Sequence, residues 1–314
     1  MLFSNGVMQT GMPVDMDHRD RTSLLRAHSY YLELLPYFHD DPDAPRTALL
    51  IGLAGGMFAR VMELYPVDLT AVEIDVKVAE LAKAYFDYGG RILYPDGREH
   101  VVDLGRFPRR RLGAWPAVDA DAGGPPAHRD AGCVYIQDGR RFLRSSARRY
   151  DFIVLDAYNS DTIPFHLITR EMFAAARKHL TDDGILAINY IGAPAGDEVT
   201  HSLARTLADV FGPEHVIAYR STDDPEAVQV LYFFVFRGEP SEPTLPAGRW
   251  ASDEPGQVDP LAYELLSRRL KLSFTRGRII TDDHNPIDVA RIKTALDWRR
   301  QTFRQFGHLK LHRF

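Results

Sequence analysis

A glycine-rich turn, GLAGG (52–56), directly follows the apolar segment 48–51. Small residues such as Gly52, Gly55 and Gly56 let the backbone of a turn come close to a ligand, and the N-terminus of a following helix attracts electronegative groups. Any tight turn between a strand and a helix also uses glycines, so a purely structural role stays equally open. The motif predicts a place where a ligand can approach the backbone.

The acidic motif EID (73–75) ends the next apolar segment, about 20 residues further on. An acid at this position, Glu73, can accept hydrogen bonds from both hydroxyls of a ribose. Asp75 has an alternative role as the N-cap of the following helix, and we expect Glu73 to bind while Asp75 caps. Enzymes that use a dinucleotide share these features, so the motif does not distinguish NAD from an adenosyl compound.

Two further acids follow apolar segments later in the chain. Asp138, in the pair Asp138-Gly139, could accept a hydrogen bond from the amino group of adenine, and capping of a helix is an equal alternative. Asp156 comes immediately after 152–155, and a carboxylate at a rigid strand end can bind an amine and take its proton during alkyl transfer. A solvated loop is the alternative, and we favour function for Asp156 while leaving both readings open for Asp161.

Apolar segments alternate with segments of helical spacing through the middle of the chain, which predicts parallel strands joined by right-handed crossovers. The expected fold class is α/β, with a doubly wound Rossmann-like sheet that binds ligands at the carboxyl ends of its strands. The four motifs fall at those ends, and the last two strands are expected to form an antiparallel pair. The predicted strands are 48–51, 69–72, 134–136, 152–155, 185–188, 216–219 and 228–236, and the predicted helices are 58–65, 76–86, 171–180 and 199–211.

Two segments interrupt this alternation. Residues 96–132 are rich in Gly, Pro, Arg and Asp without periodicity, which predicts an insertion, and the proline-rich segment 238–260 predicts a linker. Beyond the linker, 261–270 and 289–306 have helical spacing. We therefore expect an N-terminal part (1–47), a nucleoside-binding catalytic domain (48–237) and a C-terminal helical extension (238–314).

The composition is that of an ordinary globular protein, with 45% hydrophobic and 26% charged residues among 314. The net charge of −5 argues mildly against non-specific binding to nucleic acid, which needs a basic surface. The single cysteine, Cys133, excludes an internal disulfide and is expected in the core. We expect neither a transmembrane helix nor a signal peptide, and therefore a cytoplasmic protein without a membrane partner.

Five longer motifs follow one another along the chain: IGLAGG (51–56), AVEIDVKVAELAKAYF (71–86), QDGRRFL (137–143), YDFIVLDAYNSDTIPFHLIT (150–169) and LTDDGILAINY (180–190). In order and spacing they resemble the spermidine synthase family, aminopropyltransferases on a class I methyltransferase fold. The N-terminal NGVMQTGM (5–12) also resembles the short β-hairpin of that family, and TDDHNPID (281–288) resembles the tail of bacterial spermidine synthase-like proteins. Together these motifs are far more specific than any one of them.

The resemblance implies a role for each matching residue. Glu73 would hold the ribose hydroxyls, and Ile74 would pack on the adenine. Asp138 would bind the adenine amino group, and Gln9 would contact the amino-acid end of the nucleoside. Asp156 would bind the attacking amine and help to deprotonate it.

The resemblance also implies a tyrosine before the first strand, and we expect Tyr30 at that place, with His28 and Tyr31 as alternatives. The chain departs from the family at two other points. Gly55 stands where the family has an Asp that binds the free amine of the aminopropyl donor, and the second acid of the catalytic loop is displaced to Asp161. A third departure is Asn189, which replaces a Gln at the end of the fifth strand.

The leading hypothesis is an aminopropyltransferase-like enzyme that needs no metal. Its donor would be decarboxylated S-adenosylmethionine or S-adenosylmethionine, its acceptor a small-molecule amine, and its assembly a homodimer by analogy with the family. A methyltransferase that uses S-adenosylmethionine is the second hypothesis, and a nucleoside-binding protein without catalysis is the third. An NAD-dependent dehydrogenase is less favoured, because the extended resemblance points elsewhere.

Overall fold

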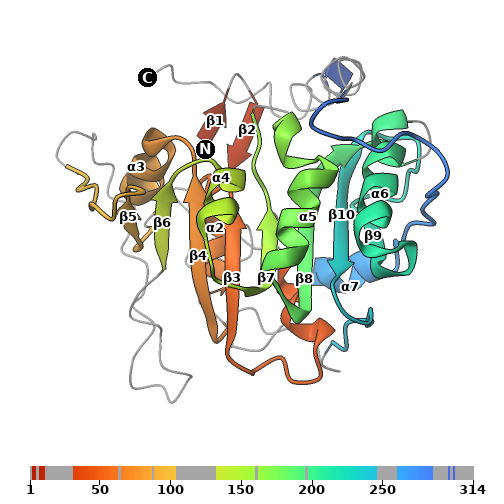
Figure 1. Cartoon of the computed structure of the whole chain (residues 1–314), viewed down its shortest axis with the longest axis horizontal. Coiled ribbons are helices and arrows are strands. Elements are labelled where there is room, and N and C mark those ends of the chain that lie inside the picture. The colour runs from red at the N-terminus through yellow and green to blue at the C-terminus, as the bar shows by residue number, and fades with distance from the viewer. Residues whose placement is uncertain are drawn as a thin grey trace.

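Eight strands form the central sheet, in the order β5-β6-β4-β3-β7-β8-β10-β9 (Figure 1). The strands are β3 (Arg46–Ile51), β4 (Val67–Glu73), β5 (Arg91–Leu93), β6 (Cys133–Ile136), β7 (Tyr150–Leu155), β8 (Leu180–Gly192), β9 (Val216–Arg220) and β10 (Gln229–Phe236). The computed structural model describes residues 2–4, 7–10, 31–62, 65–86, 88–103, 132–159, 162–194, 197–245, 260–285, 296–297 and 300.

The strands from β5 to β8 pair in parallel, and β10 pairs antiparallel with both β8 and β9. This confirms the predicted parallel sheet and its antiparallel closing pair. The chain enters the sheet at β3, and the later strands add on both sides of it. A crevice at the carboxyl ends of the strands beside β3 is where such sheets bind ligands.

Helices cover both faces of the sheet. One apolar core contains Leu50 and Val154 and is covered by α2, α3 and α7, and the other contains Leu49 and Ile153 and is covered by α4, α5 and α6 (Figure 1). Because alternate residues of one strand face opposite cores, both must be apolar, which explains the continuous apolar segments. The helices are α2 (Met57–Met62), α3 (Val76–Tyr85), α4 (Gly139–Ser145), α5 (Arg170–His179), α6 (Glu198–Phe211) and α7 (Pro260–Leu266).

Side chains at the strand ends start the helices that follow. Asp75 accepts a hydrogen bond from Lys77 N at the start of α3, and Asp138 accepts one from Arg141 N at the start of α4. Thr169 caps α5 in the same way. These caps satisfy backbone N–H groups that have no partner within the helix. The predicted capping role of Asp75 is confirmed, and Asp138 is a cap whatever else it binds.

The structure adds one strand that was not predicted and extends another. The edge strand β5 was not predicted, because Arg91–Leu93 is too short to give a periodic signal. β8 begins at Leu180 rather than at 185, since Leu180 pairs with Tyr150 before an irregularity in the register. The polar residues between Leu180 and Ile185 conceal this start in the sequence.

The N-terminal and C-terminal parts fit the predictions unequally. The strands β1 (Leu2–Ser4) and β2 (Val7–Thr10) pair antiparallel, as expected for a hairpin, although it starts before the predicted residue 5. The predicted helix 261–270 ends early, as α7, because Arg269 pairs with Tyr219 and Leu270 N donates to Ala218 O. Most of the insertion (104–131), most of the linker (246–259) and nearly all of 289–306 lie outside the described residues.

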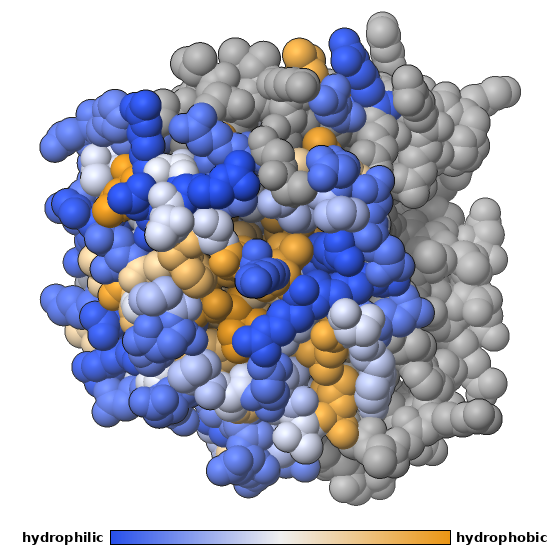
Figure 2. Space-filling view, turned by 90° about the vertical axis from the view of Figure 1, so that its right-hand side faces the viewer, coloured by the Kyte–Doolittle hydropathy of each residue, from blue (hydrophilic) through white to orange (hydrophobic). Residues whose placement is uncertain are grey.

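Residues 267–285, which follow α7, contain no helix and lie along the main domain. Figure 2, viewed from the side of α6 and β9, shows an apolar area between hydrophilic residues. Leu270, Leu272 and Phe274 pack against the core on the α5 and α6 side, and Ile280 is buried within it. Within the described ranges, no helix combines the length and apolar character that crossing a membrane requires.

Candidate functional site

The ends of the central strands bring the predicted motifs into one row. Ile51 is paired in register with Val72 of β4 and with Leu155 of β7, and Glu73 is paired with Ile136 of β6. The ladder continues one step beyond the strands, since Gly52 N donates to Val72 O and Asp156 N donates to Ile51 O, both at 2.9 Å. The side chains that follow β6, β4, β3 and β7 therefore lie at one edge of the sheet.

The glycine turn after β3 is built so that two segments can approach each other closely. Gly52 has a φ of +99°, and a Cβ on it would lie 2.4 Å from Asp156 O. Gly56 has a φ of +74°, and a Cβ there would lie 3.1 Å from the Tyr88 ring. A side chain at either position would be strained by its backbone and crowded by its neighbour. The predicted tight turn is confirmed, and Gly55 is buried within it.

The Glu73 carboxylate faces this turn. Its Oε2 accepts a hydrogen bond from Leu53 N at 3.0 Å, and its Oε1 accepts one from Asp75 N at 3.1 Å. Burial raises the pKa of the Glu73 carboxyl, and hydrogen bonds from backbone N–H groups of Asp75 and Leu53 act against that rise. The carboxylate is thus held by rigid donors beside the turn, and Ile74 next to it is 69% exposed.

Asp138 has partners on both carboxylate oxygens. Oδ1 accepts the capping hydrogen bond from Arg141 N at 2.8 Å, and Oδ2 lies 2.7 Å from Nε2 of His166. A carboxylate can only accept, so the His166 ring donates. The next residue, Gly139, has no room for a side chain, because a Cβ there would lie 2.3 Å from Ile51 Cγ2. The Asp138 side chain remains 29% exposed, and each oxygen can accept a further hydrogen bond.

Asp156 has the most strongly perturbed carboxyl at this edge of the sheet. Its Oδ1 accepts a hydrogen bond from Asn189 Nδ2 at 2.8 Å, and Tyr158 OH donates to the Asn189 carbonyl at 2.6 Å. Protein atoms surround the carboxyl although the residue keeps some exposed surface. Burial raises the pKa of Asp156 from 3.8 to about 7, and the Asn189 amide acts against the rise. A group poised near neutral pH suits proton transfer.

Several predicted site residues fall outside these contacts. Tyr30, His28 and Asp161 lie outside the described residues, and Gln9 is in β2 with its side chain undescribed. Tyr31 is 1% exposed and its ring stacks on that of Tyr232 with centroids 4.2 Å apart, which makes it a core residue. The described part of the chain contains no cluster of three or more His, Cys, Asp or Glu side chains that could hold a metal ion.

The sequence did not reveal that His166 and Arg140 contact this site. His166 lies in the short turn Phe165–Leu167, and its ring hydrogen-bonds Asp138. Arg140 forms an ion pair with Asp282, near the C-terminal end of the described chain. The first pair is separated by 28 positions and the second by 142, so neither forms a local pattern. In the sequence, only the motif QDGRRFL marked the neighbourhood of Arg140.

The chain has relatives among curated proteins, although no protein-family model matches it. A probable polyamine aminopropyl transferase of Bifidobacterium longum is 27% identical over 262 residues, 79% of this chain and 49% of that protein. An N-terminal histidine N-methyltransferase of Emericella nidulans is 29% identical over 172 residues, 54% of this chain and 24% of that protein. Further microbial relatives are named polyamine aminopropyltransferases. The chain spans about half the length, or less, of the curated relatives it matches first.

A solved structure has the same fold. The crystal structure of a probable spermidine synthase from Corynebacterium glutamicum superposes with a TM-score of 0.52 at 17% identity, covering 82% of this chain and 79% of that chain. The likeness confirms the predicted fold class. The relatives confirm the resemblance to the spermidine synthase family at modest identity.

Proposed function

We propose that this chain, as a relative of the spermidine synthase family, is an aminopropyltransferase-like enzyme that moves an alkyl group from an adenosyl sulfonium donor to a small amine. The observation that supports this most is the order of side chains along one edge of the sheet. Asp138, Glu73, Gly52 and Asp156 follow β6, β4, β3 and β7, which are neighbours in that order. Adenine, ribose, sulfonium and amine follow one another in the same order in the proposed complex.

The spacing of the strands suits such a ligand. Neighbouring strands lie about 4.8 Å apart, so the row from Asp138 to Asp156 covers three spacings, or roughly 14 Å. In the proposed complex Asp138 accepts from the adenine amino group and Glu73 accepts from the ribose hydroxyls. The glycine turn lies under the sulfonium arm, because its backbone can come close without side chains in between.

The proposed reaction is a displacement at carbon. The neutral amine attacks the carbon bonded to the sulfonium, the new C–N bond forms as the C–S bond breaks, and the electron pair stays on sulfur. With an aminopropyl donor, 5′-methylthioadenosine leaves, and the product ammonium loses one proton. Asp156 can take that proton, because its pKa of about 7 leaves a carboxylate available near neutral pH. The donor is already activated, so the protein mainly orients the two reactants.

One departure favours a second function, methyl transfer from S-adenosylmethionine. Gly55 puts no acid next to the donor's amine, and an acid there would repel the carboxylate of S-adenosylmethionine. The relative named as an N-terminal histidine N-methyltransferase also supports it. The two functions differ in which end of the donor the glycine turn accepts and in which carbon is attacked.

Binding and product analysis test the proposal together. We expect calorimetry to show tighter binding of decarboxylated S-adenosylmethionine than of S-adenosylmethionine, and chromatography to show 5′-methylthioadenosine after incubation with a panel of diamines. Preference for S-adenosylmethionine with release of S-adenosylhomocysteine would establish the methyltransferase instead. Binding without any product from the panel would favour a nucleoside-binding protein, and absence of binding by both donors would overturn the nucleoside site itself.

The proposal has three further parts. The nucleoside-binding domain covers 48–237, which contains the described strands from β3 to β10 almost entirely. The enzyme works in the cytoplasm on a free small-molecule amine. It forms a homodimer, by analogy with the family alone, and light scattering on the purified chain tests this part separately.

A further inference from the structure

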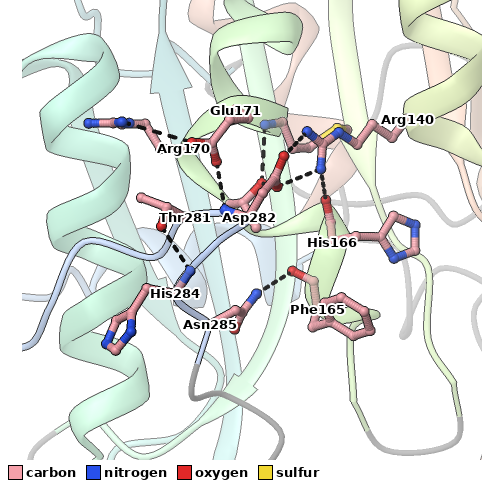
Figure 3. Close-up of polar contacts among 11 residues, drawn as sticks. Arg140, Phe165, His166, Arg170, Glu171, Thr281, Asp282, His284 and Asn285 are labelled. Carbon is pink, nitrogen blue, oxygen red and sulfur yellow. Dashed lines mark hydrogen bonds and ion pairs between the residues drawn. The ribbon is translucent and has the colours of Figure 1, made fainter.

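The segment 280–285 lies across the start of α5 and the turn before it (Figure 3). Ile280 is 1% exposed, its carbonyl accepts from Arg170 N at 2.8 Å, and its N–H donates to Thr206 Oγ1 at 2.9 Å. At the other end, Asn285 Nδ2 donates to Phe165 O at 2.9 Å. We call this segment the strap. Its two ends are fixed to α5 and α6 on one side and to the turn 165–167 on the other.

Asp282, in the middle of the strap, is bound by side chains from two elements. Its carboxylate accepts from Arg140 Nη1 and Nη2 at 2.7 and 2.5 Å and from Thr169 Oγ1 at 2.8 Å. Its backbone N–H donates to Glu171 Oε2 at 3.0 Å. A two-point contact between Arg and a carboxylate fixes orientation as well as distance. The Arg140 side chain is 15% exposed and that of Asp282 is 39% exposed, so water reaches the carboxylate more than the guanidinium.

Arg140 carries this contact to the proposed adenine site. Arg140 lies in the first turn of α4, two positions after the cap Asp138. Its Nη1 also donates to the His166 carbonyl at 3.4 Å, while the His166 ring, which points away from the strap in Figure 3, donates to Asp138 Oδ2. The strap, Arg140, His166 and Asp138 thus form one continuous set of polar contacts.

We propose that the strap positions the carboxylate that reads the base, with Asp282, Arg140 and His166 as positioning residues for Asp138. The inference rests on the proposed nucleoside site and adds a determinant of base selectivity to it. Asp138 can accept from the 6-amino group of adenine only when its oxygens point in the right direction. The Arg141 N–H fixes Oδ1 and His166 fixes Oδ2, and Arg140, paired with Asp282 of the strap, donates to the backbone carbonyl of His166.

The test measures how strongly the protein prefers one base over another. A strap with a purely structural role would not change this preference. A 6-oxo base presents an acceptor where adenine presents a donor, so a fixed carboxylate repels it, and a site that hydrogen-bonds a donor discriminates strongly against its replacement. We expect the native chain to bind 5′-methylthioadenosine more tightly than 5′-methylthioinosine. In Asp282→Asn the ratio of the two dissociation constants should fall about tenfold, because the loosened carboxylate loses one well-oriented hydrogen bond to a charged group.

The control is a second Arg–Asp pair with similar geometry on another side of the molecule. Arg268 Nε donates to Asp223 Oδ1 at 2.9 Å, and Arg268 Nη1 donates to the carbonyl of Ser221, directly after the edge strand β9. Asp223→Asn should leave the ratio unchanged. Equal weakening of both nucleosides by Asp282→Asn, or an unchanged ratio, would overturn the inference while leaving the proposed function intact.

A double-mutant cycle tests the route through His166. His166→Ala should lower the ratio by itself, and adding Asp282→Asn should lower it little further, since both changes act on Asp138 through one path. Independent, additive effects would contradict this route. Should Asp282→Asn not fold, Arg140→Lys keeps the charge and loses the two-point contact, so it measures the same effect. A native chain that binds neither nucleoside would instead overturn the proposed function.

Discussion

Glu73 and Asp156 are carboxylates at the ends of the two strands that flank β3, yet their surroundings differ. Glu73 accepts hydrogen bonds from backbone N–H groups of Leu53 and Asp75, whose positions the turn and helix fix. Asp156 accepts from one side-chain amide, that of Asn189. Burial raises the pKa of both carboxyls, but only for Glu73 do several backbone donors act against it.

The difference separates a group that binds from a group that exchanges a proton. Rigid backbone donors favour the ionised form of Glu73 and fix the direction of its free lone pairs, which suits recognition of ribose hydroxyls. A single amide donor leaves the pKa of Asp156 at about 7, which suits a group that must gain and lose a proton in each cycle. Environments that separate the pKa values of neighbouring carboxylates commonly assign their roles.

Removal of the titrating group should have the largest effect. Asp156→Asn keeps the size of the side chain and abolishes its ability to take a proton, so kcat should fall by about 10³-fold, within the usual range for general base catalysis. The dissociation constant of the nucleoside should stay within about twofold, because the base and ribose contact other strands. Steady-state kinetics and calorimetry on the same preparation measure both.

Asp151, at the other end of β7, provides the matched control. Its Oδ2 accepts from Thr47 N at 2.7 Å, far along the strand from the proposed site. Asp151→Asn should lower stability and leave kcat per folded molecule unchanged. If Asp156→Asn weakens the nucleoside as much as it slows turnover, the division between a binding and a titrating carboxylate is wrong.

The converse change at Glu73 should mainly reduce affinity. Glu73→Ala removes the acceptor for two ribose hydroxyls, and the expected weakening of the nucleoside is about 10- to 100-fold. At saturating donor, kcat should change much less. Asp75→Asn keeps a residue that caps helices well and should leave affinity unchanged. A fall in kcat without a change in affinity would reverse the roles assigned to the two carboxylates.

The sequence predicted the fold where apolar segments are long enough to show their period. β3, β4 and β7 are buried on both faces, so their continuous apolar residues identify them, and Asp75 follows its strand as an evident cap. β5 has three residues and gives no such signal. The early end of α7 follows from backbone pairing with β9, a tertiary contact that helical spacing cannot reveal.

The sequence predicted the site residues at strand ends but not the contacts between residues that are distant in the chain. Glu73 and Asp156 directly follow apolar strands, and adjacent strand ends meet, so the sequence places them together. The pair of His166 with Asp138 and the pair of Arg140 with Asp282 join residues far apart in the chain. The second pair depends on how the strap lies across α5, which no local pattern encodes.

A smaller effect should follow from changing the donor to Asp156. The Asn189 amide stabilises the ionised carboxylate, so Asn189→Ala should raise the pKa of Asp156 above about 7. The ascending limb of kcat/KM against pH should move up by about one unit, which corresponds to a hydrogen bond of ordinary strength. Rates at high pH should approach those of the native chain. The exposed Asn159 is the control, and its change to Ala should leave the profile in place. An unmoved profile in Asn189→Ala would mean that the limb reports another group.

The smallest expected effect is the one that titration of Asp156 has on the free energy of unfolding, and the direction of its pH dependence is defined. The folded pKa of Asp156 is raised, so its contribution is complete below 3.8 and is lost as pH rises through about 7. The Asn side chain of Asp156→Asn does not titrate, so this variant should not lose stability in this way. Its free energy of unfolding minus that of the native chain should therefore increase between pH 5 and pH 8, by about 1–2 kcal/mol after allowance for solvent screening. Urea unfolding at the two pH values measures the gain.

The contribution of Asp282 to stability should depend on pH in the opposite direction to that of Asp156. The Arg140 hydrogen bond lowers the pKa of Asp282, so its contribution is present at neutral pH and is lost as pH falls through the folded value. Asp282→Asn should therefore be less stable than the native chain at pH 7, and the deficit should shrink in acid. A difference between Asp156→Asn and the native chain that does not change with pH would mean that Asp156 titrates alike in the folded and unfolded chains. It would then be ionised throughout the working range and act by attracting the amine, without exchanging its proton.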